Sequence, residues 1–174
     1  MKECKTAMEK KCMKQLKYMC LAGVFAALVF VFTAYLHIPS VNGYVHIGDG
    51  FIYFASCLLP LPYALFVGAG GAVLADCLTG YAVWAPGSAV IKALLAVCFS
   101  RSGKKILTGR NVLALPIAAV VCVGGYYLYG SLIAGNFTAP IPDIPGNIMQ
   151  SVCSSVLFAV LAAVSDKLRL KKNL

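Results

Sequence analysis

The chain has 174 residues, of which 60% are hydrophobic and only 12% are charged. A soluble domain usually carries about 25% charged residues, and a chain this short cannot bury so much apolar surface in one core. The composition excludes an ordinary soluble domain and predicts an integral membrane protein. The net charge of +9 does not indicate a nucleic-acid partner, because Lys and Arg gather at the two ends and in one loop.

A membrane-spanning helix needs about 20 mostly apolar residues, and proline or polar turns divide this chain into six such segments. The predicted helices cover about residues 16–37, 46–60, 62–79, 86–100, 112–134 and 145–166. The second and third are short for full spans. We expect an all-α fold in which residues 1–174 form a single transmembrane domain.

The charges predict an orientation for these helices. The N-terminus, the loop 101–110 and the C-terminus are basic, whereas the other long loops hold no Lys or Arg. Basic segments of membrane proteins stay in the cytoplasm. Six spans place all three basic segments on that side, so both termini are expected inside.

The motifs that would indicate catalysis or metal binding are absent from the sequence. The eight cysteines show no spacing typical of zinc or haem sites, and no nucleotide-binding glycine loop or catalytic triad is found. We expect no metal, no cofactor and no enzymatic activity. An ATP-driven activity would need a separate ATPase.

Charged residues inside spans are costly and usually face a cavity or a partner. Three occur here, Asp49, Asp76 and Lys92, and the orientation places all of them in the outer half of the membrane. Other polar and aromatic groups are expected in the same half, namely His46, Tyr81, Trp84, Tyr126, Asn147 and Gln150. Asn147 and Gln150 begin one face of the last helix, which continues with Ser151 and Ser154.

This asymmetry predicts an outward-facing pocket for a small polar molecule, because ligand sites combine aromatic walls with a few polar groups. The alternative is purely structural. In that case Asp76 and Lys92 neutralise each other, and the tyrosines and Trp84 form a belt at the membrane surface.

Small residues mark a second pattern on the first helix, where Ala22, Gly23, Ala26 and Ala27 lie at positions that let helices approach closely. The stripe is consistent with packing inside the chain and with a contact to another protein.

Several motifs together resemble a known family. They are Tyr44-Val-His-Ile-Gly-Asp-Gly-Phe-Ile-Tyr53, Ala75-Asp76-x-x-Thr-Gly-Tyr81, Trp84-Ala-Pro86, Ile91-Lys92 and Asn147-x-x-Gln150. The combination resembles the substrate-binding S-components of energy-coupling factor (ECF) vitamin importers. It is closest to the branch with hydroxymethylpyrimidine, pyridoxine and riboflavin-type members.

The resemblance implies a six-helix protein of the bacterial cell membrane that binds a water-soluble vitamin from outside. Its implied partners are a transmembrane T-component and two cytoplasmic ATPases. The small residues of helix one would face the T-component, and the loop from about His37 to Tyr44 would act as a lid. A pyrimidine or pyridine compound is the expected ligand, held by Asp49, Lys92, Asn147 and Gln150 and covered by Tyr81 or Trp84.

Two alternatives remain open. A small secondary transporter driven by the proton gradient would use Asp76 and Lys92 as a proton relay, although an internal repeat is missing. A membrane scaffold or enzyme without transport activity is the other.

Overall fold

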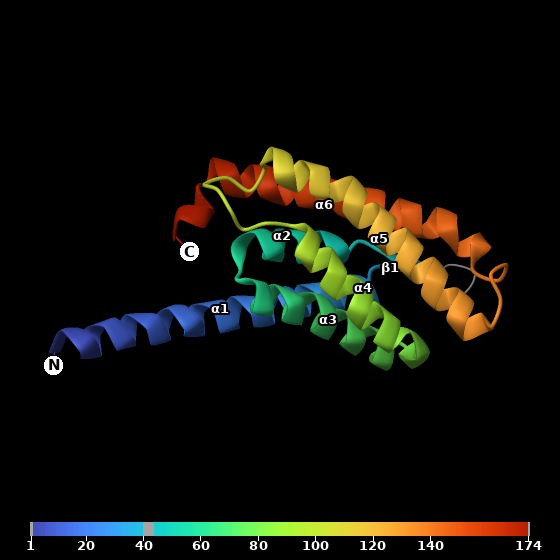
Figure 1. Ribbon diagram of the computed structural model, residues 1–174, viewed down its shortest axis with the longest axis horizontal. Helices are drawn as coiled ribbons and strands as arrows, with labels where there is room; N and C mark the ends of the chain where they lie inside the picture. Colours follow the sequence, from blue (N-terminus) through green and yellow to red (C-terminus); the bar gives the residue numbers. More distant parts are fainter. Residues whose placement is uncertain (1, 40–43, 174) are drawn as a thin grey trace.

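The computed structural model describes residues 2–39 and 44–173. The helices in this part of the chain are α1 (Lys2–Ala34), α2 (Asp49–Leu58), α3 (Leu61–Leu78), α4 (Ala85–Cys98), α5 (Gly109–Ala134) and α6 (Ile144–Lys167). Short 3-10 turns add η1 (Ala82–Trp84), η2 (Ile141–Asp143) and η3 (Leu170–Asn173). Figure 1 shows the longer helices running along the long axis of the molecule.

Four helical segments of the described residues are long and apolar enough to cross a membrane, namely Glu9–Ala34, Leu61–Leu78, Gly109–Ala134 and Ile141–Lys167. The other two apolar helices are shorter, Asp49–Leu58 and Ala82–Cys98. Large apolar side chains such as Val120 and Leu132 remain exposed on the outside. A surface of this kind suits lipid better than water.

The first helix begins far earlier than expected, at Lys2 instead of near residue 16. Residues 2–15 are rich in Lys, Glu and Met, which are good helix formers, so the helix continues beyond its apolar part. An apolar segment alone therefore marks only the membrane part of this helix.

A small hairpin is added to the helical fold and corrects the expected start of the second helix. Strand β1 (His37–Pro39) pairs antiparallel with β2 (Tyr44–His46), with Ile38 opposite Val45. Residues 44–46 are therefore extended, and α2 begins at Asp49 rather than near residue 46. The expected lid spans this hairpin, and its middle part, residues 40–43, lies outside the described residues.

Helix α3 packs between α1 and α4, and two glycines allow the close approach. A Cβ atom at Gly71 would lie 2.8 Å from the carbonyl oxygen of Ala26 on α1. A Cβ atom at Gly68 would lie 2.9 Å from the carbonyl oxygen of Lys92 on α4. Gly68 and Gly71 therefore serve packing within the chain.

Helix α2 is the buried centre of the bundle, since each of its residues from Asp49 to Leu58 is buried. It packs against α6, α3, α4 and α1. Tyr53 of α2 stacks on Phe99 at 4.5 Å between ring centroids, and Phe158 of α6 lies against both rings. An element enclosed in this way needs no full membrane length of its own.

The basic loop between α4 and α5 is fixed by buried hydrogen bonds. The fully buried Asn111 side chain donates to the carbonyl oxygens of Ser100 and Ile106, and it accepts from the Ser100 N–H. The Asp166 carboxylate accepts from the N–H groups of Ile106 and Leu107. These contacts join the loop to the C-terminal end of α6.

Candidate functional site

A pocket opens where the hairpin meets the ends of α3, α4, α5 and α6. Its lining residues are Tyr44, Val45, His46, Asp76, Tyr81, Trp84, Ser88, Tyr126, Pro140, Asp143, Asn147 and Gln150. These residues come from β2, α3, η1, α4, α5, η2 and α6 or from the short connections beside them. Seven elements of the fold therefore contribute to one cavity.

Aromatic rings form much of the wall. Tyr44 meets Tyr81 edge to face at 4.8 Å between ring centroids, and Trp84 lies 6.1 Å from Tyr126. The Tyr126 hydroxyl is also held by Ser88, at 3.1 Å between the two oxygens. Rings fixed in this way offer flat apolar surfaces to a planar ligand.

Asp76 places a carboxylate at the pocket from the end of α3. Its Oδ1 atom accepts a 2.6 Å hydrogen bond from the Tyr44 hydroxyl. Its Oδ2 atom is buried and has no partner within hydrogen-bond distance among the described residues, and the whole residue is 4% exposed. The Ser88 side chain lies close enough to interact with the same carboxylate. A buried acceptor without a partner is costly, so this oxygen is suited to a donor group on a ligand.

A buried ion pair lies beneath the pocket. The Lys92 ammonium is 2.7 Å from Oδ1 of Asp49, and the two side chains are 1% and 0% exposed. The Nε2 group of Gln150 donates to Oδ2 of Asp49 at 2.9 Å. The Oε1 atom of Gln150 accepts from the His46 N–H at 3.3 Å, so Gln150 connects the pocket and hairpin to the ion pair.

His46 is held neutral by its surroundings. Its Nδ1 atom accepts from the Gly48 N–H at 3.2 Å and lies 3.4 Å from the Thr33 hydroxyl. Burial, helped by the nearby charge of Lys92, lowers the pKa of His46 to about 3. Burial, followed by the hydrogen bond to Asp76, raises the pKa of Tyr44 well above its usual value. Neither side chain changes charge near neutral pH.

The structure brings most of the predicted site residues together. His46, Asp76, Tyr81, Trp84, Tyr126, Asn147 and Gln150 line the pocket. Asp49 and Lys92 do not line it, because they are buried beneath it and pair with each other. The alternative pairing of Lys92 with Asp76 is not seen.

Sequence reasoning missed five lining residues, Tyr44, Val45, Ser88, Pro140 and Asp143. Signals for some of them existed. Tyr44 opens the quoted motif that contains His46, and Ser88 lies one helical turn before Lys92. Asp143 is the single acid of the proline-rich segment 139–145.

The small residues of α1 divide into two groups. Ala22 and Ala26 are buried, at 2% and 8% exposure, and Ala26 lies at the crossing with α3. This places both inside the chain instead of on an outer surface. Gly23 and Ala27 are exposed, and a Cβ atom at Gly23 would meet nothing within 4 Å.

Comparison with known protein families gives a match to an S-component family. The family described as ECF-type riboflavin transporter, S component, matches residues 13–167. A comparison with curated proteins finds no match. The matched range includes every residue of the pocket and all six helices except the first residues of α1. This match confirms the expected resemblance to ECF S-components. S-components are substrate-binding subunits of vitamin transporters and not enzymes. The chain is thus a multi-pass membrane protein that belongs to the family of ECF-type riboflavin transporter S-components.

Proposed function

We propose that this S-component captures a planar nitrogen-containing aromatic vitamin, or a vitamin precursor, for an ATP-driven importer of the bacterial cell membrane. Pyrimidine and pyridine compounds such as hydroxymethylpyrimidine and pyridoxine fit this description. Riboflavin, named in the description of the family, fits it as well because its ring system contains a fused pyrimidine ring. The observation that carries the proposal is the pocket with aromatic walls and a few polar groups.

The contacts suggest how such a ligand would be held. Trp84, Tyr81 and Tyr126 supply flat surfaces for its ring. Asn147 offers both a donor and an acceptor at the edge of the ring, and Asp76 offers an open acceptor. The polar groups would fix the orientation of the ring, while the aromatic surfaces provide most of the apolar contact.

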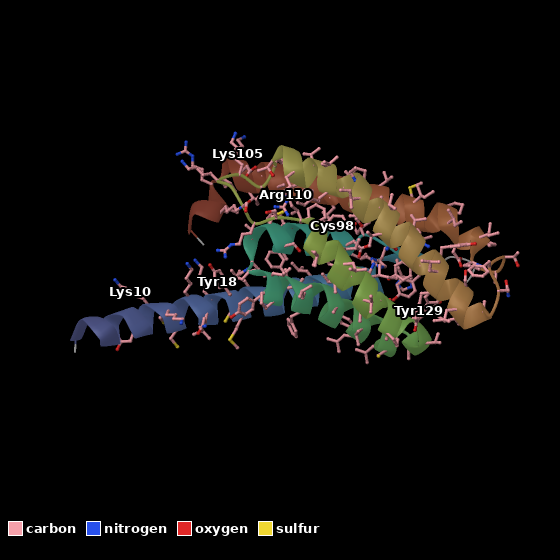
Figure 2. All side chains as sticks on the ribbon, in the orientation of Figure 1. Lys10, Tyr18, Cys98, Lys105, Arg110 and Tyr129 are labelled. Atoms are coloured by element: carbon pink, nitrogen blue, oxygen red, sulfur yellow. The ribbon has the colours of Figure 1, made fainter. Side chains whose placement is uncertain are left out.

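The membrane arrangement that we propose has six helices across or within the bilayer and both ends in the cytoplasm. Two observations support it. Figure 1 places both chain ends toward the left, away from the hairpin and the α5–α6 connection. The basic residues labelled in Figure 2, Lys10, Lys105 and Arg110, also lie toward the left, whereas Tyr129 lies toward the right. The pocket would then open to the outside.

This orientation can be tested directly. A fluorescent protein that matures only in the cytoplasm, fused to either end of the chain, should fluoresce in both cases. A dark fusion at one end, in protein that reaches the membrane, would contradict the proposed orientation.

The importer also needs partners that supply energy. We propose a transmembrane T-component and two cytoplasmic ATPases, as in the ECF transporters generally. The sequence supports this because it contains no nucleotide-binding motif of its own. The exposed Gly23 and Ala27 on α1 are suited to close contact with another membrane helix.

A secondary transporter finds less support. That alternative needed Asp76 and Lys92 as a proton relay, but Lys92 pairs with Asp49 and is sealed at 1% exposure. Asp76 pairs with Tyr44 instead.

Ligand binding to the purified full-length chain tests the proposal. Trp84 is the single tryptophan of the sequence and lines the pocket, so its fluorescence should change when an aromatic ligand binds. Riboflavin, pyridoxine and hydroxymethylpyrimidine form the first panel, with thermal unfolding as a second readout. In the Trp84→Phe control the fluorescence signal should vanish while thermal stabilisation persists. Folded protein that responds to no vitamin of this class would overturn the proposal.

A further inference from the structure

The charged side chains that line the pocket are all acidic. Asp76 and Asp143 are among the lining residues, whereas no Lys or Arg of residues 2–39 and 44–173 lines it. The remaining stretch, Ser-Val-Asn-Gly at positions 40–43, contains no charged residue type. The long segments 18–91 and 111–166 also contain neither Lys nor Arg. The chain therefore provides no Lys or Arg near the pocket except Lys92. The two histidines, His46 in the lining and His37 at 4.7 Å from the Tyr44 ring, are the other basic side chains there.

Lys92 cannot serve as a cation for a ligand in the pocket. Its ammonium pairs with both carboxylate oxygens of Asp49, at 2.7 and 2.9 Å, and the residue is 1% exposed. The Tyr126 ring lies 5.0 Å from the ammonium and is itself a lining residue, unlike Lys92. A charge that is already paired and covered offers little to an anionic ligand.

Asp76 also offers a ligand a hydrogen-bond acceptor. Asp76 contributes an acceptor, Oδ2, that is buried and unpaired among the described residues. Two of the available donors are already used, since the Tyr44 hydroxyl donates to Asp76 and Gln150 donates to Asp49. Asp76 therefore favours a ligand that donates a hydrogen bond, while Tyr81, Trp84 and Asn147 supply neutral donors but no positive charge.

We infer that the pocket selects the unphosphorylated form of its ligand: a neutral or cationic ring compound with an N–H or O–H donor for Asp76, and not the phosphate ester of that compound. The inference rests on the proposed function and adds charge selectivity to it. A phosphate group would lose water beside Asp143 without gaining a cation, and a buried anion without a partner is strongly disfavoured. Asp76 and Asp143 are thus specificity-determining residues of the site.

Matched ligand pairs test this selectivity in the purified full-length chain. The pairs are riboflavin with its 5′-phosphate and pyridoxine with its 5′-phosphate, titrated by Trp84 fluorescence and calorimetry. In the pair whose parent compound binds, the phosphate ester should bind about 100-fold more weakly or worse, because its charge is desolvated without a partner. Added salt should bring the dissociation constants of the parent compound and its ester closer together, because it screens the charge of the partly exposed Asp143.

A charge reversal at the rim provides the sharper test. Asp143→Lys should narrow the ratio between the two forms by about tenfold or more, since it replaces a repelling charge with an attracting one. Glu9→Lys makes the same change of charge on the exposed first turns of α1 and should leave the ratio unaltered.

The outcomes separate the two claims. Equal binding of both members of a pair would overturn the charge selectivity and leave the proposed function in place. The charge selectivity would also be overturned if Asp143→Lys and Glu9→Lys changed the ratio equally. Failure of both parent compounds, both esters and hydroxymethylpyrimidine to bind folded protein would overturn the proposed function, and the selectivity with it.

Discussion

At the scale of single residues, Gln150 connects the pocket to the interior. It accepts from the His46 backbone and donates to Asp49, which in turn holds Lys92. Three charged or polar groups from α2, α4 and α6 thus form one buried unit directly beneath the ligand site. Buried units of this kind are costly to leave half satisfied, which makes their energetics testable.

Breaking the ion pair on one side should be worse than removing it altogether. Lys92→Met leaves the Asp49 carboxylate buried without its cation, and we expect a loss of about 3–5 kcal/mol in unfolding free energy. The double variant Asp49→Asn with Lys92→Met carries no buried charge and should regain at least half of that loss. Thermal unfolding of the purified proteins measures both. A double variant that is no more stable than Lys92→Met would contradict the pairing.

His46 predicts a pH dependence of stability. Its pKa is about 3 in the folded chain, against about 6.5 when unfolded. The unfolded chain therefore binds more protons below pH 6.5, so stability should fall as the pH drops from 6.5 toward 3. By pH 5 the loss is about 2 kcal/mol. This loss of stability should be smaller in the His46→Gln variant. Thermal unfolding of both proteins without ligand, across this pH range, measures it. Identical pH profiles for both proteins would rule this explanation out.

At the scale of elements, α3 owes its place to two glycines that face α1 and α4. The position of α3 matters for function because its last turn carries Asp76 into the pocket. The hairpin β1–β2 does the same for Tyr44 and His46 from the other side. Helix packing and hairpin pairing together set the shape of the site.

Adjacent glycines on α3 should respond differently to alanine. A Cβ atom at Gly71 would lie 2.8 Å from both the Ala26 carbonyl oxygen and the Val29 Cβ, so α1 and α3 must separate. We expect Gly71→Ala to cost about 1–3 kcal/mol of unfolding free energy. At Gly70 the nearest atom would be 3.5 Å away, on the Phe66 ring, so Gly70→Ala should be neutral or gain up to about 1 kcal/mol in helix propensity. Thermal unfolding that ranks them in the opposite order would refute the α1–α3 packing.

The elements also show what the sequence could and could not predict. The breaks at Pro60 and Pro86 were readable because proline restricts the backbone locally. The hairpin was not, because its two strands have three residues each and owe their pairing to tertiary contacts. Tyr44 and Asp143 were missed in the site because tertiary contacts bring them to the pocket. Asp49 and Lys92 were recognised as special by their cost in a membrane, but their pairing with each other appears only in the folded chain.

At the scale of the whole molecule, the α5–α6 connection lies toward one end in Figure 1, and the labelled basic residues Lys10 and Lys105 lie toward the other in Figure 2. Residues of that connection, Pro140 and Asp143, line the pocket. The proposed function requires that a ligand captured at one end be passed on by partners in the membrane and cytoplasm. The exposed small residues of α1 are the proposed site of contact with the T-component.

Enlarging that α1 surface should weaken assembly without affecting ligand binding. Gly23→Leu and Ala27→Leu add bulk on the exposed side of α1, and we expect each to lower co-purification of the T-component several-fold. Gly124→Leu on α5 is the matched control, since a Cβ atom there also meets nothing within 4 Å. Equal recovery of the T-component with all three variants would argue against this α1 surface.

The most direct test of the central claim is to identify the ligand that the chain carries. Native mass spectrometry of the purified full-length protein, offered a mixture of water-soluble vitamins and their precursors, measures which compound is retained. We predict one retained species, a planar nitrogen-containing aromatic compound bound one to one, whose retention drops in Trp84→Ala. Folded protein that retains nothing from the mixture, or that retains a compound without such a ring, would contradict the account.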